Sequence, residues 1–369
     1  MVLKKFKRIK GITLNGLIIV IICGAIFGYG TGVISNVTSS FLGPNKSNMT
    51  LEDTVMTSSV LLGAFFGSLM SGAISDKIGR RNTLLVGAAI AIAGNTICML
   101  AFGNYIVMAI GRFVFGLALG PISSVGPLYL SECVADDMRG FLGTFFQFSI
   151  TFSIFLGVLW GFGAFKPNFW YIELGFSFLV ILVYLLAIPL FVYTFFSPDT
   201  PRFLVDRDNE KAKELFMQFM TEEEAMAEMN TIREKRKVKS TWGQLFAKQN
   251  SRAIMIGLVL AAAQQLTGIN AIIYYFNAVG EIIFQSNTTA IAATFSGIMF
   301  WNCVTSMAAI PLTSRYGRRT LLLVGQGIMF ISLAITGCAF FFAGAARSVL
   351  SILGISLFIL GFEISFNFT

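Results

Sequence analysis

A short basic sequence occurs twice in this chain, each time directly before a long apolar run. Residues 79–87 read GRRNTLLVG, and residues 317–325, 238 positions later, read GRRTLLLVG. Basic residues at the end of a membrane-spanning helix stay on the cytoplasmic side of the bilayer. Both copies therefore face the same side, and the sequence predicts a parallel duplication of a membrane-embedded helix bundle, an arrangement in which two halves can move around a central site.

The composition places most of the chain in lipid. Hydrophobic residues make up 55% of the 369 residues and charged residues only 12%, whereas about a quarter of the residues in a soluble domain are charged. A helix that crosses the bilayer needs about 20 apolar residues. This criterion predicts an all-α polytopic membrane protein with ten spanning segments, at residues 14–36, 55–75, 83–102, 105–130, 141–165, 171–196, 253–280, 289–312, 320–344 and 348–368.

The net charge of +8 follows the predicted topology. With the basic N-terminus taken as cytoplasmic, nearly all of the 27 Lys and Arg fall on cytoplasmic segments. This distribution indicates a multi-pass membrane protein with a cytoplasmic N-terminus and no nucleic-acid partner. We expect it in the plasma membrane rather than an internal one. The N-x-S/T sequons at Asn36, Asn45, Asn48 and Asn287 fall on predicted exterior loops or their edges, which agrees with this orientation and predicts a glycoprotein.

The residue types argue against several kinds of site. The chain has no His, and its five Cys lie in or at the ends of apolar segments without paired spacing, so neither a zinc site nor a disulfide framework is expected. We find no nucleophile elbow, phosphate loop or cluster of metal ligands. The sequence therefore predicts no enzyme activity, no cofactor, no metal and no obligate protein partner besides the lipid bilayer.

The order of apolar and polar segments predicts three parts. Residues 1–196 form a six-helix transmembrane bundle, residues 197–252 a cytoplasmic helical linker, and residues 253–369 a partial second bundle of about four helices. In the linker, apolar residues at helical spacing and a capping box at Thr221–Glu224 predict two or three short amphipathic helices. The basic run Arg233–Lys239 can equally be a solvated connector. If the second bundle repeats the first, about ten of twelve helices are present, and we expect a C-terminally truncated chain.

Small residues four positions apart predict two close helix contacts. Such spacing lets the backbones of two helices approach each other. The residues are Gly24, Gly28 and Gly32 in the first spanning segment, and Ala64, Ser68 and Gly72 in the second.

Motifs along almost the whole chain resemble those of one transporter family. The loop Gly72–Arg81 fits the pattern G-x-x-x-D-R/K-x-G-R-R/K. Seven further motifs occur along the chain in the family's order, namely FGYGTGVIS at 27–35, GRF at 111–113, PLYLSE at 127–132, RGFLGTFFQ at 139–147, SPDTPRFL at 197–204, QQLTGIN at 264–270 and SRYGRRT at 314–320. The chain thus resembles the sugar porter branch of the major facilitator superfamily. The resemblance implies that fold, a small-molecule sugar substrate and transport by alternating access.

The two Gly-Arg-Arg loops are expected to act as gates. Glycine permits a tight turn, and carboxylates and arginines can exchange ion pairs between two arrangements of the bundles. The alternative is that the arginines only anchor the topology. The residues to which we assign gating are Asp76, Arg80, Arg81, Glu132, Arg139, Arg315, Arg318 and Arg319.

Three amides in an apolar span carry the predicted ligand chemistry. Gln264, Gln265 and Asn270 can each donate and accept hydrogen bonds, which suits a neutral polyhydroxylated ligand. On an ideal helix they point in different directions, so the helix must bend or unwind at residues 267–269 for them to converge. The alternative is that they join helices to one another. With the positions that the resemblance adds, the predicted substrate residues are Gln147, Ile150, Ile154, Gln264, Gln265, Asn270, Tyr274, Asn302 and Glu363.

Proton coupling would require a titratable carboxylate on the transport route. In proton-coupled members of the resembling family, an acid follows the F-G-Y of the first helix and faces an arginine of the fourth. Here these positions are Gly30 and Arg112. We therefore expect uniport of a hexose such as glucose, with Arg112 capping backbone carbonyls or meeting water. The alternatives are a proton symporter that uses Glu363, a sugar sensor, and a non-functional truncated remnant.

Overall fold

Long helices match the predicted spanning segments. The computed structural model describes residues 11–34, 51–101, 104–164, 172–237, 248–284, 287–342 and 344–366, and these residues contain no strand. Nine helical stretches among them are long and apolar enough to cross a bilayer. The first group comprises α2 (Ile12–Gly32), α4 (Leu51–Ile78), α5 (Arg80–Met99), α6 (Tyr105–Glu132), α7 (Asp136–Ala164) and α8 (Ile172–Phe196). The second comprises α13 (Lys248–Leu266), α14 (Ile269–Tyr274), α15 (Phe276–Phe284), α16 (Thr288–Arg315), α17 (Arg318–Ala339) and α18 (Ala345–Phe366).

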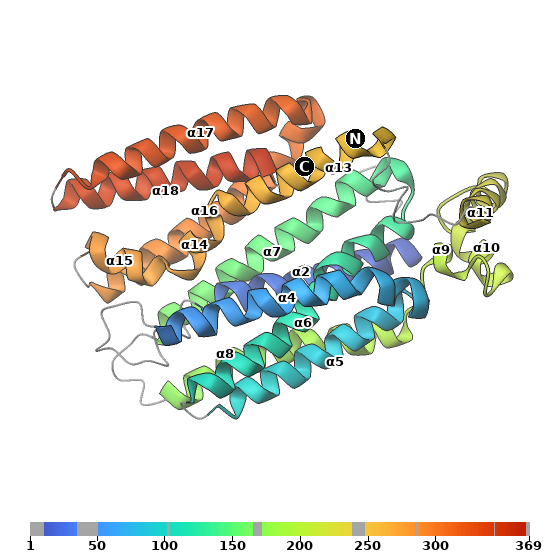
Figure 1. Cartoon of the computed structure of the whole chain (residues 1–369), viewed down its shortest axis with the longest axis horizontal. Helices are drawn as coiled ribbons and strands as arrows, with labels where there is room; N and C mark the ends of the chain where they lie inside the picture. Colours follow the sequence, from blue (N-terminus) through green and yellow to red (C-terminus); the bar gives the residue numbers. More distant parts are fainter. Residues whose placement is uncertain are drawn as a thin grey trace.

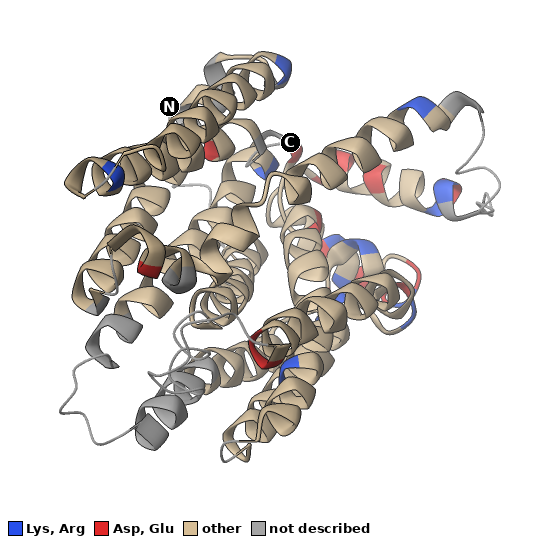
Figure 2. Cartoon of the chain, turned by 60° about the vertical axis from the view of Figure 1, so that its left-hand side comes forward, with Lys and Arg blue, Asp and Glu red and all other residues tan. Residues whose placement is uncertain are grey.

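The charge distribution agrees with membrane embedding. In Figure 2 the long helices are free of charged residues over most of their length, and Lys, Arg, Asp and Glu lie mainly near helix ends. The sixth predicted segment, residues 171–196, coincides with α8, whose apolar described stretch is Tyr184–Phe196. We call residues 12–196 the first half and residues 248–366 the second half.

The predicted segment 253–280 is interrupted, as expected from its sequence. It is divided among α13, α14 and α15. Gly268 precedes α14 with a left-handed φ of 81°, a conformation that other residues rarely adopt. The bend expected at residues 267–269 is therefore confirmed.

Helices α2 and α7 approach each other closely through glycine. A Cβ on Gly24 would lie 2.7 Å from the Phe146 carbonyl oxygen, and one on Gly32 would lie 2.6 Å from the Ile154 carbonyl oxygen. Gly28 meets the α7 backbone in the same way. The predicted packing of the first spanning segment is therefore confirmed, and it fixes the position of α7, which carries three predicted substrate residues.

The second predicted packing contact is correct only in part. A Cβ on Gly116 of α6 would lie 3.0 Å from the Ala64 nitrogen, and Gly120 meets the backbone at Ser68. Gly72, in contrast, has no atom within 4 Å of the Cβ position, so its assignment to the contact was wrong. Gly72 faces open space, although the hydroxyl of the neighbouring Ser71 still forms a hydrogen bond with the Ser124 hydroxyl of α6 at 2.9 Å.

The two halves meet mainly where α7 packs against α16. Ile154 and Val158 of α7 belong to one apolar cluster with Ile273 of α14 and Phe295 of α16. The pair α17 and α18 packs together on the outer side of this second half, with α18 against α16 (Figure 1). Residues of both halves therefore pack together at the junction of α7, α14 and α16.

Three short helices follow the first half in the described part of residues 197–252, where two or three were predicted. They are α9 (Pro201–Leu204), α10 (Asn209–Met217) and α11 (Glu222–Lys237), and they lie beyond one end of the long helices (Figure 1). The predicted capping box is present, because the Thr221 nitrogen donates to Glu224 Oε2 at 3.0 Å and the Glu224 nitrogen donates to Thr221 Oγ1 at 3.4 Å. The Gln218 side chain ties this linker to the bundle by accepting from the Ile12 nitrogen at 2.8 Å.

Candidate functional site

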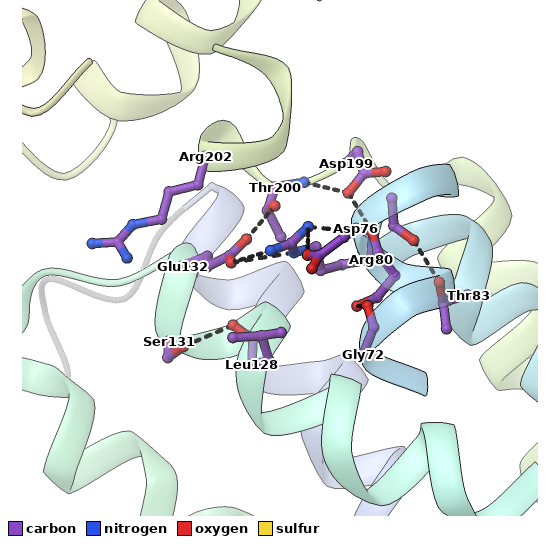
Figure 3. A network of polar contacts seen from close by, with 12 residues as sticks. Gly72, Asp76, Arg80, Thr83, Leu128, Ser131, Glu132, Asp199, Thr200 and Arg202 are labelled. Carbon is purple, nitrogen blue, oxygen red and sulfur yellow. Dashed lines mark hydrogen bonds and ion pairs between the residues drawn. The ribbon is translucent and has the colours of Figure 1, made fainter. Parts of the chain in front are cut away.

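Arg80 is the centre of a polar network at the end of the first half (Figure 3). The chain turns at Gly79, where φ is 96°, and α5 begins with Arg80. The Arg80 guanidinium pairs with Glu132 of α6 at 3.1 Å and with Asp76 of α4 at 3.2 Å. Glu132 is 5% exposed and Asp76 73% exposed. The buried pair therefore joins α5 to α6, while the Asp76 pair lies near the surface.

Asp199, for which we predicted no role, caps the start of α5. Its Oδ1 atom accepts hydrogen bonds from the nitrogens of Arg80 at 3.2 Å, Arg81 at 3.3 Å and Thr200 at 2.8 Å. The Thr200 hydroxyl donates to Glu132 at 2.5 Å. Burial raises the pKa of the Asp199 carboxyl above its ordinary value, although these hydrogen bonds act in the opposite direction. The segment before α9 is thus bound to the Arg80 network (Figure 3).

The other predicted gating residues of the first half lie around this network. Arg81 donates to the backbone carbonyls of Thr194 and Phe195 at the end of α8. Arg139 donates to the Ser131 carbonyl at 2.8 Å and pairs with Asp136 at 2.6 Å. Arg139 therefore contacts the residue next to Glu132.

The second Gly-Arg-Arg loop differs from the first in its backbone. Gly317 has φ −65° and ψ 145°, which any residue can adopt, and no atom lies within 4 Å of its Cβ position. Arg319 is exposed. The side chains of Arg315 and Arg318 lie outside the described residues, as do the sequons Asn36, Asn45 and Asn48. The gating role of this loop stays a prediction.

The helix break brings two of the three predicted amides together. Asn270 Nδ2 donates to Gln265 Oε1 at 2.8 Å. The Gln264 carbonyl accepts from the Thr267 hydroxyl at 2.7 Å, at the end of α13. The Gln265 side chain is exposed and the Asn270 side chain is half-buried. Both retain hydrogen-bonding capacity, because an amide has two donors and two acceptor sites.

Tyr274 places part of α14 against the first half. Its side chain is 8% exposed, and it belongs to the apolar cluster that contains Ile154, with Ile150 packed against that cluster. Ile34, at the end of the first spanning segment, belongs to the same cluster. Ile34, which lies in the FGYGTGVIS motif but had no assigned role, therefore takes part in the contact between the halves.

The remaining predicted substrate residues lie on α7, α16 and α18. Asn302 is 4% exposed and Glu363 is 2% exposed. Asn302 Oδ1 has no hydrogen-bond partner among the described residues. Gln147 is half-buried, and its carbonyl accepts from Thr151 Oγ1 at 3.3 Å. A buried acceptor without a donor is unfavourable, so Asn302 is chemically suited to a ligand that brings a hydroxyl group.

Arg112 caps a backbone carbonyl, as expected. Its Nη2 atom donates to the Gly30 carbonyl oxygen at 3.2 Å, and its guanidinium carbon lies 6.0 Å from the centre of the Phe115 ring. The side chain is 7% exposed. Within the described part of the chain, Arg112 forms no ion pair with a carboxylate, and its Nε atom has no hydrogen-bond partner.

Comparisons with known proteins identify relatives of the chain. The family model described as sugar (and other) transporter matches residues 16–369. The glucose transporter GlcP of Staphylococcus epidermidis is 31% identical over 353 residues, which are 93% of this chain and 76% of that protein. The galactose-proton symporter of Escherichia coli is 30% identical over 370 residues, which are 98% of this chain and 78% of that protein.

Solved structures show the same fold. The E. coli xylose transporter XylE in a partially occluded inward-open conformation superposes with a TM-score of 0.80 at 21% identity, covering 97% of this chain and 86% of that one. The proton:xylose symporter XylE bound to 6-bromo-6-deoxy-D-glucose gives a TM-score of 0.80 at 22% identity, with 96% and 80% covered.

Proposed function

The chain belongs to the sugar transporter family of the major facilitator superfamily, and from that premise we propose that it carries a hexose across the membrane by facilitated diffusion. It is a multi-pass membrane protein and not an enzyme. The relatives named for glucose and galactose support a hexose as the substrate, with D-glucose the first to test. Their bacterial origin supports the plasma membrane as the location.

The proposed sugar site lies at the junction of the two halves. Asn270 and Gln265 meet at the break between α13 and α14, and Asn302 offers a buried oxygen that needs a donor. Sugar hydroxyls can donate and accept at once, which matches amides. Micromolar to millimolar affinity corresponds to about 4–8 kcal/mol, which a few hydrogen bonds of about 1 kcal/mol each and ring burial can supply.

One observation carries the proposal of uniport. Arg112 donates to the Gly30 carbonyl, at the position where a carboxylate could otherwise have paired with it. Because Gly30 carries no titratable side chain, Arg112 has no partner at this position that could bind and release a coupled proton. The second candidate is proton symport, which is favoured by the buried Glu363 and by relatives that are named proton symporters.

We assign the closing of one end to the Arg80 network. It joins α4, α5 and α6 to the segment before α9, so the bundle of residues 1–196 can move as a unit relative to residues 253–369, with residues 197–252 as the connection. Breaking and re-forming such ion pairs is a common way to switch between two packed arrangements.

Uptake of labelled D-glucose tests both candidates. The full chain is expressed in cells that lack their own hexose carriers, and uptake is followed with and without a protonophore. Uniport predicts uptake that stops at equilibrium and is insensitive to the protonophore. Accumulation above the outside concentration that the protonophore abolishes would instead establish symport. Membrane insertion without uptake of any hexose would contradict the proposal.

A further inference from the structure

Arg112 places a positive charge inside the first half. The residue is 7% exposed, its Nη2 atom donates to the neutral Gly30 carbonyl at 3.2 Å, and its Nε atom has no hydrogen-bond partner among the described residues. The Phe115 ring, 6.0 Å from the guanidinium carbon, adds only the attraction of an aromatic face. A buried ion is normally paired with an opposite charge, because a carbonyl dipole compensates it only in part. Facilitated diffusion of a neutral sugar assigns no task to this charge.

The carboxylates of the chain do not supply the missing counter-charge. Among the described side chains, every ion pair joins other residues than Arg112. The residues that lie outside the described ranges contain neither Asp nor Glu. Within the described helices, Asp137 and Glu173 are the acidic residues whose side chains are not described.

The backbone positions of these two acids are far from Arg112. Asp137 follows the far end of α6, about 30 Å along the helix axis from Arg112. Glu173 stands at the start of α8, about 16 Å along that helix from Tyr184. The Tyr184 hydroxyl contacts the Thr96 hydroxyl at 2.6 Å, in the part of α5 that packs on α6 around Arg112. Both acids are therefore beyond the reach of the guanidinium.

The guanidinium lies on the side of α2 that faces α6. Gly28 and Gly32 meet the backbone of α7, whereas Gly30, between them, lies against the Phe115 ring of α6. Arg112 extends from α6 to the Gly30 carbonyl. Its charge is therefore enclosed within the first half, apart from the α7 residues that we propose to contact the sugar.

We propose that the Arg112 guanidinium binds a small monovalent anion, chloride, which takes the place of a carboxylate partner. The Nε–H group and the other guanidinium N–H groups are strong donors to an anion. Because a Cβ at Gly30 would already lie 2.6 Å from Phe115 Cε1, a single-atom ion suits this contact better than a carboxylate. Nε is buried, so the ion enters as the Phe115 ring turns away from the guanidinium.

The test is thermal unfolding of the purified full chain in detergent, with potassium chloride exchanged for potassium methanesulfonate at constant ionic strength. Methanesulfonate has the same charge but is larger, so screening is unchanged while the proposed ligand is removed. A ligand that binds only the folded state raises the midpoint of unfolding. At about ten times its dissociation constant, chloride should raise the ratio of folded to unfolded chain about elevenfold. No sugar is present, so the result does not depend on uptake.

Three variants assign the effect to Arg112. The chloride dependence should disappear in Arg112→Gln, which removes the charge, and persist at higher chloride concentration in Arg112→Lys, which keeps it. Arg202→Gln is the matched control, because it removes an arginine of α9 that is 37% exposed and pairs with Glu228 at 2.8 Å. This control should respond to chloride as the unmodified chain does.

Equilibrium binding of radiolabelled chloride to the unmodified chain decides the question if Arg112→Gln does not fold. We expect a single chloride ion per chain, displaced by bromide and not by methanesulfonate. Absence of bound chloride, or an equal chloride response in the unmodified chain and Arg112→Gln, would overturn the inference. D-glucuronate is the second ligand to test. If it raises the midpoint through Arg112 and chloride does not, the counter-charge comes from a sugar carboxylate, and the assignment of chloride is wrong.

Discussion

Arg112 and Gly30 form a buried hydrogen bond of 3.2 Å between a guanidinium and a backbone carbonyl. Gly30 is also tightly enclosed, because a Cβ at this position would lie 2.6 Å from Phe115 Cε1. A peptide carbonyl is only a partial partner for a buried positive charge. The same short distance that excludes a side chain at Gly30 therefore keeps a carboxylate away from Arg112.

A carboxylate at this position should introduce proton dependence only if space is made for it. Gly30→Asp alone overpacks the contact with Phe115, and we expect a destabilisation of about 1–3 kcal/mol. In the double variant Gly30→Asp with Phe115→Ala, the new carboxylate can pair with Arg112. Uptake by the double variant should become sensitive to a protonophore.

The control for this experiment is Phe115→Ala alone, which enlarges the space without adding an acid. Its uptake should be insensitive to the protonophore. Equal protonophore responses of the single and double variants would contradict the role assigned to position 30.

Glu132 should contribute more to stability than Asp76, although both pair with Arg80. Removing one partner of a buried ion pair costs about 3–5 kcal/mol, whereas an exposed pair contributes about 0–1 kcal/mol. Because Glu132 is 5% and Asp76 73% exposed, Glu132→Gln should clearly lower the midpoint of thermal unfolding in detergent. Asp76→Asn is the matched control and should change it little. Similar shifts in both variants would show that burial does not govern this network.

The charge of Asp199 should destabilise the folded chain as the pH rises. Burial raises its pKa above the ordinary value of 3.8, so the folded state binds the proton more tightly than the unfolded state. The contribution of the protonated Asp199 to the free energy of unfolding is fully present below about pH 3.8. It is lost as the pH rises through the folded-state pKa. Asp199→Asn keeps an acceptor oxygen and does not titrate.

Thermal unfolding of both proteins across this pH range tests the prediction for Asp199. The Asn variant should match the unmodified chain at low pH and become the more stable of the two as the pH rises. Asp199→Ala is the control, because it loses three hydrogen bonds to backbone nitrogens and should be destabilised by about 0.5–2 kcal/mol, as for other helix caps. If the difference in thermal stability between the Asp199→Asn variant and the unmodified chain became smaller as the pH rises, the assigned sign would be wrong.

Local signals in the sequence were sufficient for much of the fold. Apolar run length predicted the spanning helices, the Thr221–Glu224 pattern predicted a helix start, and Gly268 marked the break that α14 follows. Each of these features depends on residues close together in the chain. The error at Gly72 arose because small-residue spacing alone does not show which positions of a helix face its neighbour.

The contacts between distant segments could not be predicted in this way. Asp199 lies 119 residues from the Arg80 nitrogen that it caps, and Ile34 and Tyr274, which share one apolar cluster, belong to different halves. Their meeting depends on the rotation and depth of packed helices, which the sequence of one helix does not determine. The motifs that contain Asp199 and Ile34 were visible in the sequence, but the partners of these residues were not.

Loss of either amide at the helix break should weaken sugar binding. Gln265→Ala and Asn270→Ala each remove one member of the 2.8 Å hydrogen bond and its remaining capacity for the ligand. We expect KM to rise by about fivefold, corresponding to about 1 kcal/mol, with unchanged membrane insertion. Asn82→Ala, which removes an exposed amide that donates to the Ile78 carbonyl at the end of α4, is the control. Normal KM values in both site variants would exclude these amides from the sugar site.

The break between α13 and α14 should itself be required for transport. Gly268→Ala adds a methyl group in open space, but at φ 81° the new side chain is strained by about 1 kcal/mol. The strain favours a straighter helix, which would separate Asn270 from Gln265 and raise the KM. Gly257→Ala is the matched control, because Gly257 lies within α13, also in open space but without a positive φ, and Ala is the better helix former. We therefore expect reduced uptake for Gly268→Ala and unchanged uptake for Gly257→Ala, and equal uptake by the two variants would show that the break is not needed.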